Sequence, residues 1–187
     1  MIEMTNLTNH FLIAMPTLGD PNFFRTVTYM CQHNDEGALG IIINRPTDMT
    51  LSDILQQMKI EADDDTTRNL PIYYGGPVQS DRGFVIHEPV GDWNSSFQVT
   101  ESVALTTSRD ILEAIAAGEG PKKILIALGY AGWGEGQLER EIVENAWLNA
   151  PVKTEILFDI PANQRWKSAA EEMGVDLDLL SSQAGHG

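Results

Sequence analysis

Short apolar runs separated by turn residues dominate the chain, and most of them have the length and composition of β-strands. Val27, Tyr29 and Cys31 alternate with polar residues, so we expect these three side chains to share one buried face. Strands are predicted over residues 11–15, 25–33, 38–44, 72–74, 83–87, 124–128 and 156–158, with one or two more near Val99 and at 103–105.

Four segments carry helix signals. Thr50 and Thr107 each precede an apolar-periodic segment and are followed three residues later by an aspartate, which is the spacing of a capping box. Helices are predicted over residues 51–58, from the Thr107 cap to 117, over 137–148 and over 165–173. The acidic segment 61–69 is predicted to be an exposed loop, and the glycine-rich segment 129–136 a turn.

The order of these elements indicates the fold class. Strands occur both as hairpin neighbours and in alternation with helices, which favours an α+β protein with layered α/β character. We expect a single compact domain over residues 1–187, with a mixed, largely antiparallel sheet and helices packed on it. Residues 1–9 and 181–187 are predicted to be frayed tails.

Cysteine content and hydropathy indicate the compartment. Cys31 is the single cysteine, so no disulfide can form within the chain, and a reducing compartment is expected. The N-terminal residues lack a basic segment, and the apolar run at 11–15 is too short for a secretion signal. No stretch approaches the roughly 20 apolar residues of a membrane span. The sequence therefore predicts a cytoplasmic protein without a membrane partner.

The charge balance narrows the classes of partner. Twelve Lys and Arg residues against 27 Asp and Glu residues give a formal net charge of −15. Nucleic-acid binders draw most of their affinity from cationic side chains that neutralise phosphates, and a chain this acidic repels a polyanion. The composition thus disfavours nucleic acid as a partner.

Cys31 and His33 are the first candidates for chemistry. Two residues apart on a strand, they are predicted to point to the same face, and a thiol beside an imidazole can form a nucleophile. The alternative is that Cys31 is a core residue like Val27 and Tyr29, because buried cysteines commonly behave as small hydrophobes. The core interpretation is favoured, since no protease or transferase motif surrounds the pair.

The segment with Gly132, Gly134 and Gly136 between a strand and a helix is a second candidate. Backbone amides in such a segment can bind phosphate, but the spacing matches neither dinucleotide fingerprint nor P-loop, and Glu135 and Glu139 would repel an anion. A close-packed turn is favoured. The carboxylates at 135–144 and 63–65 and the four histidines lack metal-ligand spacing, so no metal, cofactor or catalytic residue is predicted.

Polar side chains inside apolar, glycine-punctuated segments are better candidates for binding a ligand or partner. We expect Glu141 to pair with Arg45 or Arg82 and to line a small cleft with Gln137 beside Trp133. Each candidate could instead be a structural hydrogen-bonding residue. The candidates are Asn44, Arg45, Arg82, His87, Trp133, Gln137 and Glu141.

Five blocks of the sequence form a distinctive set. The block at 129–139 reads Gly-Tyr-Ala-Gly-Trp-Gly-x-Gly-Gln-Leu-Glu and is highly specific. The other blocks lie at 11–16 with 20–23, at 37–46, at 75–78 with 82–87, and at 106–110. Together they resemble the YqgE/AlgH family of small bacterial proteins, and the likeness covers about residues 11–158.

The resemblance implies an α/β fold with a mixed sheet and brings no established catalytic residue or cofactor. One branch of the family takes its name from a proposed role in transcriptional control. Our leading hypothesis is a non-enzymatic binding or regulatory protein that contacts an unknown protein or small molecule. The alternatives are an uncharacterised hydrolase or transferase with a cleft near the glycine-rich turn, and a DNA-binding transcriptional regulator.

Overall fold

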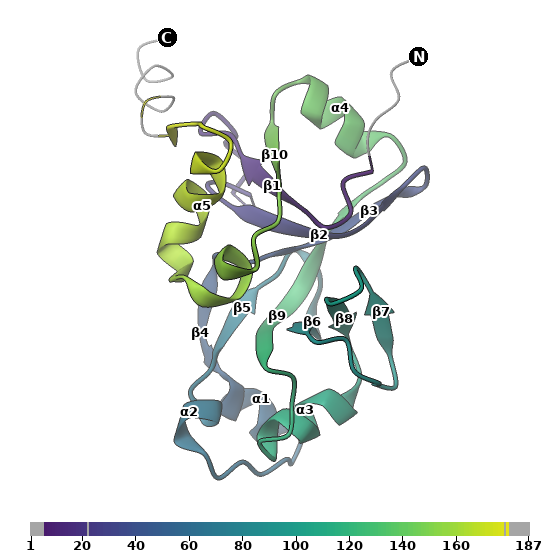
Figure 1. The fold of residues 1–187 in the computed structure, drawn as a ribbon, viewed down its shortest axis with the longest axis vertical. Coiled ribbons are helices and arrows are strands. Elements are labelled where there is room, and N and C mark those ends of the chain that lie inside the picture. Colours follow the sequence, from purple (N-terminus) through teal and green to yellow (C-terminus); the bar gives the residue numbers. More distant parts are fainter. Residues whose placement is uncertain (1–5, 22, 178, 180–187) are drawn as a thin grey trace.

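The strands form one strongly curled sheet in the computed structural model, which describes residues 6–21, 23–177 and 179 (Figure 1). Its main path runs β10-β1-β2-β3-β9-β6-β8-β7, and β5 joins at β9 and carries β4 on its other edge. The β5–β9 pair is parallel, and the remaining pairs are antiparallel. This confirms the predicted mixed, largely antiparallel sheet. The strands are β1 (His10–Ala14), β2 (Val27–Asn34), β3 (Gly37–Ile42), β4 (Pro46–Thr50), β5 (Pro71–Tyr74), β6 (Val78–Glu88), β7 (Ser96–Gln98), β8 (Ala104–Thr106), β9 (Lys123–Trp133) and β10 (Trp147–Pro151).

Helices cover both ends and one side of this sheet. α1 (Leu51–Gln57) begins with the predicted capping box, in which the Thr50 main-chain N–H donates to Asp53 Oδ2 at 2.9 Å. α3 (Arg109–Ala116) has Ser108 at its N-cap and not, as predicted, Thr107; the Asp110 carboxylate accepts the Ser108 hydroxyl and the Asn94 main-chain N–H. The other helical segments are α2 (Asp65–Arg68), α4 (Gln137–Val143), the π-helix η1 (Glu155–Asp159) and α5 (Ala162–Glu171).

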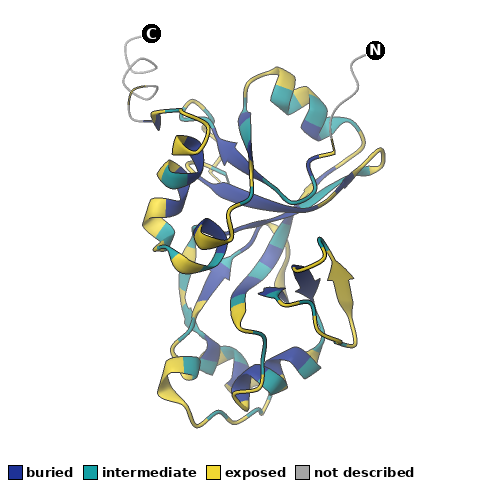
Figure 2. Ribbon diagram, viewed as in Figure 1, coloured by how far each residue is buried: buried dark blue, intermediate teal, exposed yellow. Residues whose placement is uncertain are grey.

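Three groups of buried side chains form the core, and the long strand β9 contributes to each. α5 and η1 cover one face of β1, β2 and β3, while α4 covers the opposite face of these strands. α1 and α3 pack together against β5, β6 and the first half of β9. Apart from the short α2, which has no buried residue, the α-helices are buried along the side that faces the sheet and more exposed on the other (Figure 2).

Two predicted elements of the second half are wrong. The helix expected over 137–148 ends at Val143, and Trp147 begins β10, which pairs with β1. Asn145, with a φ of 62°, breaks the helix in the left-handed region that asparagine tolerates. Residues 156–158, predicted as a strand, lie in η1, because a short apolar run fits a buried helix and a buried strand equally well. The acidic loop 61–69 includes the one-turn helix α2.

The N-terminal segment is held from Leu7 onward, although residues up to 9 were expected to fray. The Leu7 main-chain N–H donates to His33 Nδ1 at 3.0 Å, and the Asn9 N–H donates to the Met30 carbonyl at 2.8 Å. Residues 1–5 and the predicted tail at 181–187 lie outside the described residues. Among the described helices, none is both long and apolar enough to cross a membrane.

Candidate functional site

A β-bulge separates Cys31 from His33 and overturns the prediction that they share a face. The register between β2 and β3 shifts between Met30 and Gln32, so the alternation of side chains along β2 is interrupted at Cys31. Cys31 packs in the core beneath α5, while His33 turns to the opposite face and contacts α4. The bulge therefore removes the proposed nucleophile pair.

The surroundings of both residues agree with structural roles. Cys31 is fully buried, and burial raises the pKa of its thiol far above the ordinary value, so the reactive thiolate is disfavoured. His33 accepts the Leu7 N–H at Nδ1, so its Nε2 carries the proton that is donated to Glu139 Oε1 at 2.5 Å. His33 thereby ties the N-terminal segment to α4.

The first part of the glycine-rich segment, up to Trp133, belongs to β9. The predicted turn begins only at Gly134. β9 runs through Trp133, and its Gly129 lies against Gly75 and Gly76 with backbone touching backbone. A Cβ on Gly76 would lie 2.0 Å from the Tyr130 carbonyl carbon, and one on Gly129 would lie 2.3 Å from the Gly76 oxygen. These glycines permit close approach of two strands, so they are needed for packing.

Trp133, Gln137 and Glu141 come together as predicted, but around a different partner. Glu141 Oε1 accepts the indole N–H of Trp133 at 3.0 Å and that of Trp147 at 2.9 Å. Its Oε2 accepts Gln137 Nε2 at 3.0 Å, and Gln137 Oε1 accepts the Gly134 N–H at 3.0 Å. The Phe23 ring packs against both indoles, with centroid separations of 6.0 and 5.4 Å. Glu141 thus anchors α4 to an aromatic cluster.

The predicted pairing of Glu141 with Arg45 or Arg82 is wrong. Arg45 donates to the Pro21 and Phe24 carbonyls at 3.0 and 2.7 Å, and thereby holds the loop that precedes β2. Arg82 donates to Gln79 Oε1 and to the Thr107 hydroxyl at 3.3 and 3.2 Å. The ion pair was predicted because opposite charges attract. In the fold, the indole N–H groups of Trp133 and Trp147 lie at the Glu141 carboxylate instead.

Asn44 and His87 lie away from the Glu141 cluster and make local bonds. The Asn44 amide accepts the Val27 N–H and donates to the Arg25 carbonyl, both at 2.9 Å. His87 is fully buried, with Nδ1 2.9 Å from the Pro89 carbonyl and Nε2 2.6 Å from the Thr106 hydroxyl. Because the Pro89 carbonyl only accepts, His87 Nδ1 carries the proton that it donates there. The seven predicted site residues do not form one cleft.

Buried His87 should make the protein less stable in mild acid. Burial lowers the pKa of His87 below its ordinary value, and its bond to the Pro89 carbonyl opposes this only in part. The unfolded chain therefore binds a proton below about pH 6.5 more readily than the folded chain does, and stability falls as the pH falls. Urea unfolding between pH 7.5 and pH 5 should show a steeper loss for the wild type than for His87→Gln. Parallel curves would contradict this.

The structure offers a groove beside the glycine-rich segment, and of the seven predicted site residues Trp133 lines it. Its volume is about 470 Å³ and it opens widely to solvent between the β2–β3 hairpin and β9. Gln32, Leu39, Val78, Tyr130 and Gly132 contribute to its walls. Of these, Tyr130 and Gly132 lie within the block at 129–139, Val78 in the block at 75–78 and Leu39 in the block at 37–46, so the blocks could have pointed to the groove; Gln32 lies in none of them.

Gly132 differs from the close-packed glycines of the same strand. It is exposed, and a Cβ there would meet its nearest heavy atom, Tyr130 Cε2, at 3.4 Å, which is ordinary van der Waals contact. Its φ is not in the left-handed region. Packing within the chain therefore does not require glycine at this position, although a glycine inside a strand is destabilising relative to alanine.

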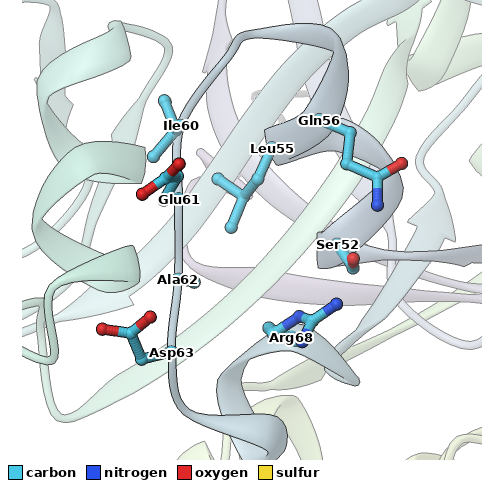
Figure 3. Close-up of a pocket in the computed structure, with 8 residues that line it drawn as sticks. All are labelled: Ser52, Leu55, Gln56, Ile60, Glu61, Ala62, Asp63 and Arg68. Atoms are coloured by element: carbon cyan, nitrogen blue, oxygen red, sulfur yellow. The ribbon is translucent and has the colours of Figure 1, made fainter.

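A second concavity of about 270 Å³ lies at the opposite end of the molecule between α1, α2 and the loop at 60–63 (Figure 3). Arg68 lies near Ser52 and Gln56, while Glu61 and Asp63 lie along the loop across from them. The Arg68 side chain is 46% exposed and lies 3.9 Å from Asp65. The described residues bring no group of three His, Cys, Asp or Glu side chains together as metal ligands there or elsewhere.

Comparison with known proteins gives matches along nearly the whole chain. Residues 11–178 match the AlgH-like protein family. A UPF0301 protein of Methylococcus capsulatus is 60% identical over 185 residues, covering 99% of this chain and 98% of its own. A UPF0301 protein of Thioalkalivibrio sulfidiphilus is 59% identical over 186 residues and covers 100% of both chains.

Two solved structures share the fold. The solution structure of the AlgH protein from Pseudomonas aeruginosa matches with a TM-score of 0.81 and 50% identity, over 100% of this chain and 99% of that one. The crystal structure of protein DIP2367 from Corynebacterium diphtheriae matches with a TM-score of 0.75 over 97% and 94% of the two chains. At 17% identity, this second likeness concerns the fold alone.

Proposed function

This chain belongs to the AlgH-like family, and we propose that it is a non-enzymatic binding protein that holds a segment of a partner protein in the groove beside Gly132. Exposed Gly132 is the observation that carries the proposal. Glycine inside a strand commonly marks a place where another backbone or a ligand approaches closely, and among the described residues only the Tyr130 and Val78 side chains come within 4 Å of a Cβ placed there, at ordinary contact distances. A partner segment is the group that we expect to approach there.

The form of the groove favours a polypeptide over a small molecule. Small ligands bind in concave sites that bury most of their surface, whereas this groove is open along the hairpin. Its wall combines amides such as Gln32 and Asn34 with the apolar surface of Leu39, Val78 and Tyr130. Mixed surfaces of this kind are typical of interfaces between separate proteins.

Charge indicates what kind of protein would bind. The chain carries a net charge of −15, and the groove wall includes Glu36. Complementary charge accelerates association and disfavours wrong partners, so we expect a partner segment with basic residues. A regulatory role, if this chain has one, would then be exerted through protein contacts in the cytoplasm.

Filling the groove at Gly132 should abolish partner capture without unfolding the protein. The tagged chain would be incubated with a lysate of Methylococcus capsulatus, which has a close relative of this chain, and captured proteins would be quantified by mass spectrometry. We expect Gly132→Gln to reduce capture of a specific partner at least tenfold. The free energy of unfolding should change by less than about 1 kcal/mol, as for other exposed positions.

Gly83→Gln is the matched control. Gly83 also lies within a strand, a Cβ there would have no neighbour within 4 Å, and it does not line the groove. This variant should capture the partner as the wild type does. Equal capture by the two variants would contradict the proposed groove. A reaction catalysed by the purified chain and lost in Gly132→Gln would assign catalysis, and not simple binding, to this surface.

A further inference from the structure

Arg165 places a buried positive charge in the core beneath α5. Arg165 is only 4% exposed, and its Nε donates to the Ile160 carbonyl at 3.2 Å. One terminal nitrogen donates to the Ile43 carbonyl, and the guanidinium carbon lies 5.1 Å from the centroid of the Tyr73 ring. The recorded partners of this guanidinium are thus two main-chain carbonyls and Tyr73, all of them neutral.

No carboxylate of the described residues forms an ion pair with Arg165. Asp159 is the acidic group that acts on it, but the Asp159 carboxylate bonds to Lys123 Nζ at 2.5 Å. Burial lowers the pKa of Arg165, and Tyr73 and Asp159 act in the opposite direction. An arginine nevertheless stays protonated in proteins, so the buried charge persists. Buried charges are ordinarily paired, because removing an ion from water without a counter-ion is costly.

A cavity of about 120 Å³ adjoins this charge. Its lining includes the apolar side chains of Leu70, Ile124, Ile126 and Phe158, and Arg165 and Tyr73 are the lining residues whose side chains can donate hydrogen bonds. Apolar cavities of roughly 150 Å³ hold a benzene molecule with its six carbons, so this space encloses about five non-hydrogen atoms, and its partly open side leaves room for one or two more. The cavity therefore offers a charged group and a small apolar chamber.

The backbone that forms one wall is irregular. Phe158 lies in the π-helix η1, and Ile160, whose carbonyl holds Arg165, follows that segment directly. π-Helical turns are rare and occur frequently at functional sites, because the extra residue redirects side chains. Here the turn directs Phe158 to the cavity and places the Ile160 carbonyl on Arg165.

We propose that this cavity binds a small monocarboxylate, whose carboxylate pairs with Arg165 and whose hydrocarbon part is enclosed by Leu70, Ile124, Ile126 and Phe158. A carboxylate would complete the bonding of the buried guanidinium. The planar N–H donors of arginine match the geometry of a carboxylate. The site uses β5, the first half of β9 and α5. It is separate from the groove at Gly132 and does not depend on the function proposed there.

Isovalerate, with seven non-hydrogen atoms, is the probe, and isovaleramide is its neutral counterpart of the same shape. We expect isovalerate at millimolar concentration to raise the melting temperature in a saturable way and to shift the amide resonances of Tyr73 and Phe158. Isovaleramide should bind at least tenfold more weakly because it lacks the charge that Arg165 compensates. Acetate at the same ionic strength should have a much smaller effect, since it leaves the apolar chamber empty.

Two variants and a control separate binding from folding. Arg165→Gln should lose the response to isovalerate, and Ile124→Trp should lose it by filling the cavity while Arg165 stays in place. Arg68→Gln, which changes an exposed arginine elsewhere, should respond as the wild type does. No response of the wild type to 50 mM isovalerate, an equal response to isovaleramide, or an unchanged response in Ile124→Trp would each overturn the proposal.

Discussion

Replacing Glu141 with alanine should destabilise the protein by about 3 kcal/mol or more, because two indole N–H groups lose their acceptor at once. Hydrogen bonds to a charged acceptor contribute about 1.5–3 kcal/mol each, and Trp133 and Trp147 are both largely buried. Water can reach these donors only if the aromatic cluster loosens. Chemical denaturation monitored by tryptophan fluorescence would measure both the loss of stability and any change around the indoles.

Two further variants, one at Glu141 and one at Glu144 directly after α4, serve as comparisons. Glu141→Gln keeps one carbonyl oxygen for the indoles but turns an N–H₂ toward Gln137, which already donates there, so a smaller loss of about 1 kcal/mol is expected. Exposed Glu144→Ala should change stability by less than about 0.5 kcal/mol. If Glu141→Ala were no worse than Glu144→Ala, the carboxylate would not be the anchor of α4.

The elements that the sequence predicted well are those whose signals are local. Alternation along Val27, Tyr29 and Cys31 correctly gave the face of β2 that is buried beneath α5. Thr50 and Asp53 correctly gave the start of α1, since both halves of a capping box lie within one turn. Such signals depend mainly on neighbours in the chain, although the same spacing at Thr107 placed the cap of α3 one residue too early.

The elements that were predicted wrongly depend on contacts distant in sequence. α4 and β10 pack against the same aromatic cluster, so Ala146 and Trp147 continue the apolar pattern of the helix. This pattern concealed the break at Asn145. The bulge at Cys31 has no sequence signature, yet it decides that His33 faces Glu139 and not the thiol. Side-chain chemistry alone therefore could not give the geometry of either pair.

The contacts among the candidate site residues were predictable only in part. The block at 129–139 correctly drew attention to Trp133, Gln137 and Glu141, which do contact one another. The glycines of that block proved to be of two kinds, and the sequence cannot distinguish them. Gly129, with a φ of 79°, is required by the close backbone of Gly76, whereas no contact among the described residues requires glycine at 132. Backbone conformation and the space beside each Cα distinguish the two glycines.

Gly76→Ala should destabilise the protein by about 3 kcal/mol or more, and the variant should be largely unfolded or insoluble at 37 °C. Its Cβ would lie 2.0 Å from the Tyr130 carbonyl carbon and 2.4 Å from the Ala131 nitrogen, and its φ of 154° is one that alanine rarely adopts. Overpacking and backbone strain each contribute about 1–3 kcal/mol. Neighbouring Gly75 is packed as tightly, since a Cβ there would lie 2.3 Å from the Gly129 oxygen, so the segment cannot move aside.

Gly132→Ala should have the opposite outcome, and thermal denaturation of the two variants side by side tests the distinction. Alanine at an exposed strand position removes conformational freedom from the unfolded chain and meets only an ordinary contact with Tyr130. The melting temperature should therefore stay the same or rise slightly. If Gly132→Ala were as damaging as Gly76→Ala, packing within the chain would explain Gly132, and the argument that a partner approaches there would lose its basis.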